Sequence, residues 1–177
     1  MKKQKSINNL VLSAMLLTLA IVLPFMTGQI PEIGNMLCPM HIPVLLCGFV
    51  CSAPWGMVVG ATAPLIRSML FGKPILFPSA VSMAFELAVY GLMTGVLYKV
   101  LPKKKGYIYL SLVLAMISGR IVWGITQYVI LKLNATGFGF AAFWAGAVTN
   151  AIPGIILQIV FVPVLVMLCE KIKPNKM

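Results

Sequence analysis

The sequence predicts an all-α integral membrane protein, a single bundle of six membrane-spanning helices with both termini in the cytoplasm. Composition gives the first reason, because 60% of the 177 residues are hydrophobic and only 10% are charged. The second reason is a mean hydropathy of +1.01, which is too high for a soluble domain. A helix needs about 20 predominantly apolar residues to cross a bilayer, so the chain has room for about six spans and little else.

The apolar segments are divided by turns in which proline, glycine or charge interrupts the periodic pattern. They predict helices over Asn9–Met26, Pro39–Ser52, Gly56–Phe71, Ser79–Val100, Tyr107–Lys132 and Ala141–Lys171. The second and third segments are short, so a single broken hairpin that does not fully cross the bilayer is an alternative. The first segment follows a basic start, as a signal peptide would. It lacks a small-residue cleavage site and leads into further spans, so we expect it to be retained.

Lysine placement predicts the orientation, because Lys and Arg residues that flank the spans are retained on the cytoplasmic side. Six spans bring three groups of basic residues to one side of the membrane. These groups are Lys2, Lys3 and Lys5; Lys99, Lys103, Lys104 and Lys105; and Lys171, Lys173 and Lys176. We therefore attribute the net charge of +11 to the basic residues that set the topology and contact anionic headgroups. Nucleic-acid binding is not expected.

Polar residues within the apolar segments gather in the half of the bundle that this orientation places outside. At 1.5 Å per residue, Arg67 and Glu86 lie roughly 6 to 10 Å below the outer surface. On the fifth helix, Arg120, Trp123 and Gln127 recur at i, i+3 and i+7 on one face. The other candidates for a small-molecule site are His41, Tyr90 and Asn150, with a loop above them that carries Glu32 and Asn35.

The charged residues of this cluster have a structural and a functional interpretation. Arg67 and Glu86 either form an ion pair that fixes the helix register or contact a ligand. The only acids in the chain are Glu32, Glu86 and Glu170. If Glu86 pairs with Arg67, Arg120 has no membrane carboxylate to neutralise it, and we expect Arg120 to bind the ligand.

Each uncharged candidate also has a structural and a functional interpretation. Trp123 and Tyr90 are either core residues or platforms on which a ligand stacks, and Asn150 either bonds a neighbouring helix or contacts the ligand. His41 with Cys38 supplies only two metal ligands, so we expect no metal site. The chain has no phosphate-binding loop, nucleophile elbow or metalloprotease motif, so we expect neither an enzyme nor a bound cofactor.

Two stretches carry a resemblance to a known family. The first is PVLLCGFVCSAPWGMVVGATAPLIRSMLFG, with its spaced prolines and glycines, and the second is FPSAVSMAFELAVYGLMTGVLYK. With six short helices and both termini inside, the chain resembles the substrate-binding S component of an energy-coupling factor (ECF) vitamin transporter. Within that family it is most similar to the riboflavin and pantothenate type.

The resemblance implies a vitamin site near the outer face of a bacterial plasma membrane, gated by the loop that carries Glu32 and Asn35. It also implies a membrane-embedded coupling subunit that contacts the first three helices, and two cytoplasmic ATPase subunits that hydrolyse ATP. Many family members dock through an alanine-xxx-alanine motif on the first helix. Here its nearest match is Ala14 and Thr18.

The leading hypothesis is therefore an S component that binds a small water-soluble vitamin or precursor; the resemblance implies that it carries the ligand inward by toppling within the membrane. The alternatives are a self-sufficient oligomeric carrier or channel, and a membrane assembly factor without a ligand. Two arginines suit an anionic group such as the pantothenate carboxylate, whereas an unpaired Glu86 suits a hydroxyl or ring-nitrogen donor, as in riboflavin or a B6 vitamer. The sequence leaves the vitamin open.

Overall fold

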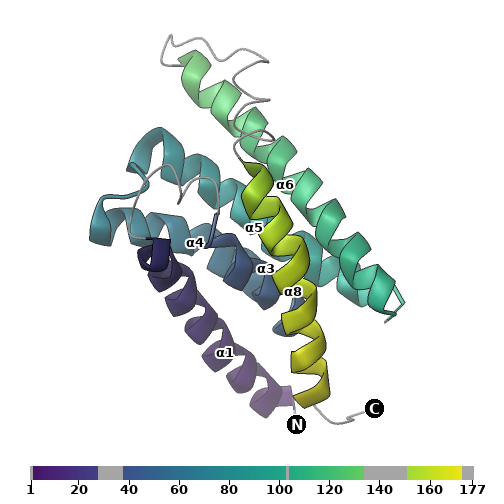
Figure 1. Cartoon of the computed structure of the whole chain (residues 1–177). Helices are drawn as coiled ribbons and strands as arrows, with labels where there is room; N and C mark the ends of the chain where they lie inside the picture. The colour runs from purple at the N-terminus through teal and green to yellow at the C-terminus, as the bar shows by residue number, and fades with distance from the viewer. Residues whose placement is uncertain (1, 28–37, 103, 134–150, 173–177) are drawn as a thin grey trace.

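The computed structural model describes residues 2–27, 38–102, 104–133 and 151–172, and every regular element in these ranges is helical (Figure 1). The long helices are α1 (Lys2–Val22), α4 (Ala53–Phe71), α5 (Val81–Val100), α6 (Lys105–Leu133) and α8 (Ile152–Ile172). A shorter helix, α3 (His41–Val50), precedes α4. A 3-10 turn, η1 (Leu23–Thr27), follows α1, and a π-helical turn, η2 (Leu76–Ala80), leads into α5.

Four stretches within these ranges are long and apolar enough to cross a membrane, namely Ser6–Met26, Leu76–Val100, Lys105–Lys132 and Ile152–Lys171. The first helix starts at Lys2, seven residues before the predicted start at Asn9. Residues 141–150 of the predicted last helix lie outside the described ranges. The chain is a multi-helix membrane protein, and its six spans and the side on which its termini lie stay predictions.

Helices α3 and α4 are separate elements that meet at a sharp corner. Ser52, with φ of 130°, stands between them, and Pro54 occupies the first turn of α4, where a missing N–H costs nothing. The α3 helix has only 10 residues, about 15 Å, which is too short for a full span. The predicted boundary between the second and third segments therefore lies where the chain turns.

The centre of the bundle is the crossing of α4 over α5, where the two backbones touch. A methyl group on Gly91 of α5 would fall on the backbone carbonyl of Gly56 in α4, and one on Gly60 would fall on the backbone of Leu87. Small residues allow this approach, which in a membrane supplies the van der Waals contact that holds helices together. The glycine spacing read from the sequence is thus a packing seam.

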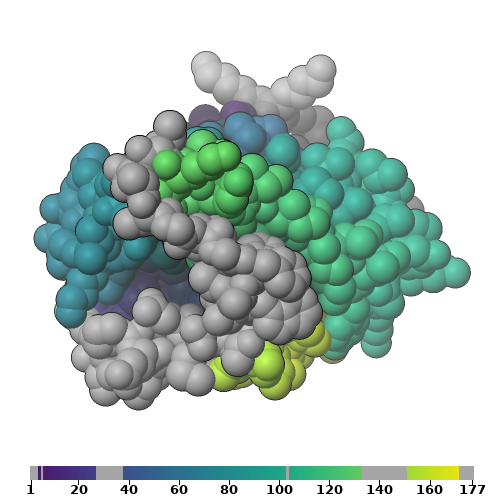
Figure 2. Space-filling model, turned by 90° about the horizontal axis from the view of Figure 1, so that it is seen from above, coloured from purple at the N-terminus to yellow at the C-terminus, as the bar shows by residue number. Residues whose placement is uncertain are grey.

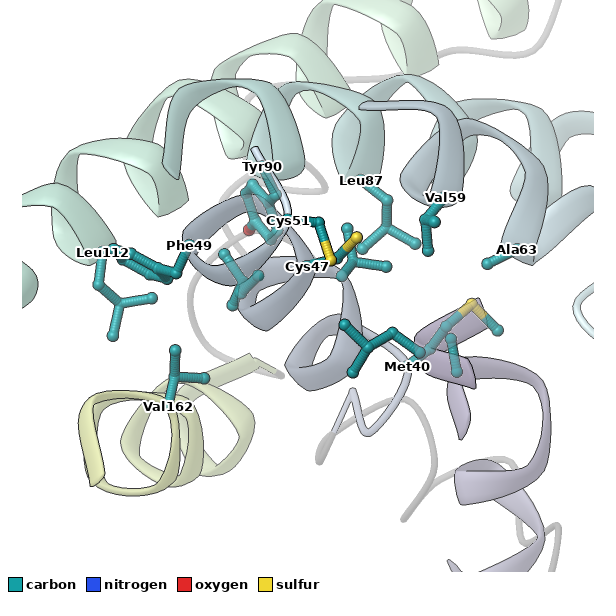
Figure 3. Packing of buried hydrophobic residues seen from close by; sticks show 14 of the residues in the cluster. Met40, Cys47, Phe49, Cys51, Val59, Ala63, Leu87, Tyr90, Leu112 and Val162 are labelled. Atoms are coloured by element: carbon teal, nitrogen blue, oxygen red, sulfur yellow. The ribbon is translucent and has the colours of Figure 1, made fainter. Parts of the chain in front are cut away.

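Helix α3 lies in the middle of the bundle, with α1 and α8 on its flanks (Figure 1). Its buried side chains form one apolar cluster with residues of α5, α6 and α8; in Figure 3, Val162 of α8 lies below Phe49 of α3 and Leu112 of α6. Outward faces of α1 and α8 expose large apolar side chains such as Met15 and Leu168, as lipid-facing helices do. Seen from above, the C-terminal part of α6 lies beside η2 (Figure 2).

Candidate functional site

Helices α5 and α6 pack antiparallel with matched polar faces. Near the start of α5, the Ser82 hydroxyl donates to Oε1 of Gln127, across a distance of 3.1 Å. Two turns further along α5, the ring of Tyr90 lies against Gly119 of α6, where any side chain would overlap it. This register places Glu86, midway between Ser82 and Tyr90, beside the stretch of α6 that begins at Arg120.

The carboxylate of Glu86 is the centre of a buried charged cluster. Only 1% of Glu86 is exposed, and its Oε1 lies 3.2 Å from Nη1 of Arg120. The same oxygen lies 3.6 Å from Nε2 of His41, which enters from the first turn of α3. Three helices thus converge on one carboxylate, and Arg120 also reaches Cys38 just before α3, with 3.9 Å between Nη2 and the thiol sulfur.

Tyr90 completes this cluster, which we call the Glu86 cluster: His41, Glu86, Tyr90 and Arg120. The Tyr90 ring packs edge-on against the His41 ring with 5.3 Å between centroids. Within the described part of the chain, neither ring nitrogen of His41 makes a hydrogen bond of regular geometry, nor does the Tyr90 hydroxyl. Trp123 lies one turn from Arg120 on α6 and is partly buried. The Glu86–Arg120 ion pair therefore lies beside two ring side chains, His41 and Tyr90, whose polar atoms have no hydrogen bond of regular geometry among the described residues.

The observed pairing corrects the sequence interpretation of the two arginines. Arg120, which was expected to lack a carboxylate, pairs with Glu86. The alternative in which Arg67 pairs with Glu86 is wrong. Depth along each helix, which is all that the sequence predicted, does not specify which helix faces make the contact.

Arg67 instead fastens α4 to the end of α1. Its guanidinium donates to the Ile21 carbonyl and lies over the rings of Phe25, 4.9 Å from its centroid, and Phe71, at 5.7 Å. Pro24 has no N–H to donate to the carbonyl three residues before it, which is that of Ile21. A cation at the C-terminal end of a helix is also favoured by the helix dipole. The Arg67 side chain therefore caps α1 and makes cation–π contacts with two rings that pack edge-on against each other.

Sequence analysis missed Gln158, a buried amide on α8. Gln158 of α8 is 1% exposed, and neither Oε1 nor Nε2 makes a hydrogen bond within the described residues. It lies on the buried stripe of α8 with Gly154, Val162 and Val166. The helix has a mean composition typical of a lipid-facing span, so its single amide gave no periodic signal.

The sequence matches the family model described as "ECF transporter, substrate-specific component" over residues 8–166. The chain belongs to this family. Comparison with curated proteins and with solved structures finds no significant match. Family membership makes the chain a transport protein of the membrane, and the resemblance drawn from its glycine and proline pattern is confirmed at the level of the family. Its likeness to the riboflavin and pantothenate type stays a prediction.

Several predicted residues of this S component lie elsewhere. Asn150, Glu32 and Asn35 fall outside the described residues. Ala14 and Thr18 lie on an exposed face of α1, where the Thr18 hydroxyl donates to the Ala14 carbonyl at 3.0 Å. Within the described ranges, no group of three or more His, Cys, Asp or Glu side chains is placed to hold a metal ion.

At the opposite end of the S component, the hydroxyl of Tyr98 on α5 donates to the Glu170 carboxylate on α8. The Phe49 ring of α3 packs edge-on against Tyr98, with 5.3 Å between centroids. These contacts tie three helices together at the end that carries Lys99 and Lys171. Glu86 and Glu170, the two carboxylates in the described part of the chain, therefore make their contacts at opposite ends of the bundle.

The Arg67 contacts predict a stability effect without a binding effect. Arg67→Met removes a charge-assisted hydrogen bond and two ring contacts, so we expect a loss of about 1.5 to 3 kcal/mol in the free energy of unfolding. Ligand affinity should change less than twofold, because Arg67 is not part of the Glu86 cluster. Unfolding in detergent and titration with the co-purified ligand measure the two effects. If binding were weakened and the unfolding midpoint unchanged, Arg67 would belong to the ligand site and not to the helix contact.

Proposed function

We propose that this S component binds a small water-soluble vitamin or precursor at the Glu86 cluster, between α3, α5 and α6, and delivers it inward. Delivery requires a membrane-embedded coupling subunit and two cytoplasmic ATPase subunits that hydrolyse ATP, while this chain itself binds no cofactor. The proposal places the chain in a bacterial plasma membrane as six spans, with both termini in the cytoplasm. The family, shown by the match over residues 8–166, supports the transport role.

The observation that carries the proposal is the buried charged cluster itself. Removing a carboxylate and a guanidinium from water costs several kcal/mol per ion, and their mutual attraction often fails to repay it. Ionisable residues inside a membrane therefore mark functional sites by default. Glu86, Arg120 and His41 come from three different helices. A ligand that enters among these helices would contact all of them, which favours a binding site over a contact between two helices.

Residues around the cluster are proposed to complete the pocket. Trp123 and Gln127 share the polar face of α6 with Arg120, and the loop with Glu32 and Asn35 is proposed to close over the ligand, with Asn150 nearby. Ala14 and Thr18 are proposed to face the coupling subunit. Both residues are exposed on α1, as a docking surface requires.

Topology is tested by accessibility of single cysteines in a variant that lacks the four native ones, Cys38, Cys47, Cys51 and Cys169. Lys73→Cys lies in the exposed connection after α4, which the positive-residue pattern places outside. Lys104→Cys lies in the exposed connection before α6, placed inside. In intact cells, a membrane-impermeant maleimide should label position 73 and leave position 104 unlabelled. The reverse labelling would invert the proposed orientation.

Ligand binding is tested by native mass spectrometry of the protein purified in mild detergent from bacterial membranes. We expect a complex with one small molecule per chain, released by collision and identified by its mass. The matched sample is Glu86→Gln, in which the centre of the cluster is changed and the bound fraction should fall at least tenfold. Equal occupancy in the two proteins would place the ligand elsewhere in the bundle.

A further inference from the structure

The guanidinium of Arg120 has hydrogen-bonding capacity that the Glu86 cluster does not use. A guanidinium carries five N–H donors. In the described residues, its Nη1 faces Oε1 of Glu86 at 3.2 Å and its Nη2 faces the Cys38 sulfur, a weak acceptor, at 3.9 Å. Its buried Nε has no hydrogen-bond partner among these residues. Arg120 can therefore hold a second acceptor while it stays paired with Glu86.

Two ring side chains add to this excess of donors. The Tyr90 hydroxyl and both ring nitrogens of His41 have no hydrogen bond of regular geometry in the described part of the chain. Both residues are at most 1% exposed, so bulk water does not satisfy them. Tyr90 supplies one O–H donor, and His41 supplies one N–H donor when neutral and two when protonated. In either state of His41, the donors of the cluster outnumber the lone pairs of the Glu86 carboxylate.

The charge of the cluster favours an anionic ligand group, whichever charge His41 carries. Glu86 and Arg120 sum to zero, and His41, 3.6 Å from Glu86, adds either nothing or one positive charge. A cationic group would be repelled by Arg120 and would compete with it for Glu86. A doubly charged phosphate would leave negative charge uncompensated in both states of His41. A group with one negative charge fits the cluster best.

Arg120 is also the more accessible member of the ion pair. Its side chain is 15% exposed, whereas that of Glu86 is 2% exposed. Cys38, which lies beside Nη2 of Arg120, is half-buried. A ligand group can therefore approach the guanidinium while Glu86 stays covered behind it.

We propose that the free N–H groups of Arg120 bind a carboxylate of the ligand, with Tyr90 and His41 as further donors. This inference rests on the proposed function and adds the class of ligand to it. The planar guanidinium matches the two oxygens of a carboxylate, and hydrogen bonds between ionised groups are about twice as strong as neutral ones. A ligand that donates to Glu86 is disfavoured, because Arg120 already faces this carboxylate. Glu86 holds the guanidinium in place, so Glu86→Gln should weaken binding although it removes a negative charge.

Matched pairs of compounds test the ligand class. Purified wild-type protein is titrated near neutral pH with pantothenate and pantothenol, nicotinate and nicotinamide, and biotin and biotin amide, with thermal unfolding and calorimetry as readouts. We expect a carboxylate to bind about tenfold or more tightly than its uncharged counterpart. An uncharged member that binds as tightly as its carboxylate overturns the inference. So does a phosphate that is preferred to its parent alcohol, for which riboflavin 5′-phosphate and riboflavin are compared.

The molecule identified by native mass spectrometry provides a second test, which does not depend on the choice of compounds. We expect this molecule to carry a carboxylate. A bound molecule without a carboxylate overturns the inference and leaves the proposed function intact.

The Arg120→Lys variant tests the residue, because lysine keeps the positive charge opposite Glu86 but loses the planar fork of donors. We expect affinity for the carboxylate to fall about tenfold to a hundredfold, and its advantage over the uncharged counterpart to narrow. Arg67→Lys makes the same change at the arginine that caps α1, and it should leave both affinities unchanged. Unchanged affinity in Arg120→Lys overturns the role of Arg120, whether or not its stability falls. An equal loss of affinity for both compounds, with the selectivity retained, overturns it too.

The same experiments separate this inference from the proposed function. If none of the compounds binds wild-type protein, and no small molecule accompanies it in native mass spectrometry, the proposed function is contradicted and the inference falls with it. If a ligand binds but has no carboxylate, or binds equally well to Arg120→Lys, only the inference fails.

Discussion

Glu86→Gln is expected to lower the free energy of unfolding by about 3 to 5 kcal/mol, the usual cost of removing one partner from a buried ion pair. The change keeps the shape of the side chain but removes the charge that Arg120 faces at 3.2 Å. Arg120 is then left largely buried without a counterion, because no other carboxylate lies within ion-pair distance of it among the described residues. Unfolding in mixed detergent micelles, followed by tryptophan fluorescence, measures the loss.

Two further variants show whether this loss comes from the charge. Glu170→Gln changes an exposed carboxylate at the other end of the bundle and should cost less than about 1 kcal/mol. Glu86→Gln combined with Arg120→Gln removes both charges and should recover most of the stability, since a neutral buried pair avoids the uncompensated ion. A double variant no more stable than Glu86→Gln alone would show that geometry at the cluster, and not its charge balance, sets the cost.

Gly91→Ala is expected to destabilise the bundle by about 3 kcal/mol, the upper end of the range for overpacking a well-packed interior. The added methyl group would fall on the Gly56 carbonyl, and backbone atoms cannot move aside as a flexible side chain can. Helices α4 and α5 would have to separate along the most extensive contact of the bundle. The shift in the midpoint of thermal unfolding, measured in detergent, gives the size of the effect. The midpoint of unfolding by detergent provides a second measurement.

Gly106→Ala is the matched control for Gly91→Ala. Gly106 lies in the first turn of α6, where an added methyl group meets nothing within 4 Å. Alanine is a better helix former than glycine, so this variant should be as stable as the wild type or slightly more stable. If Gly91→Ala were equally harmless, the backbone contact between α4 and α5 could not be as close as the structure has it.

The sequence allowed the polar half of the site to be predicted because helical periodicity reports which residues share a face. Arg120, Trp123 and Gln127 fall on the face of α6 that meets α5, and Glu86 lies on the facing side of α5. Periodicity does not report how two helices are rotated against each other. The choice between Arg67 and Arg120 as the partner of Glu86 depended on that rotation, and it was made wrongly.

Other features depend on tertiary contacts that no local pattern contains. Arg67 finds its acceptor 46 residues away, at a carbonyl that Pro24 leaves without a 3-10 bond, and backbone acceptors are invisible to an inventory of side chains. Gln158 was missed because one amide in an apolar helix is a weak signal until its burial is known. The glycine spacing of α4 and α5 is visible in the sequence, but the backbone that each glycine contacts is known only from the fold.

Transport by reconstituted vesicles tests the central claim most directly, that this chain is the substrate-binding part of a larger importer. The protein is placed in lipid vesicles alone or with a coupling subunit and two ATPases of the ECF type, and uptake of the co-purified ligand is followed with and without internal ATP. The account predicts ligand binding in both preparations and accumulation only with the partner subunits and ATP. Accumulation above the external concentration by vesicles that contain this chain alone would contradict it.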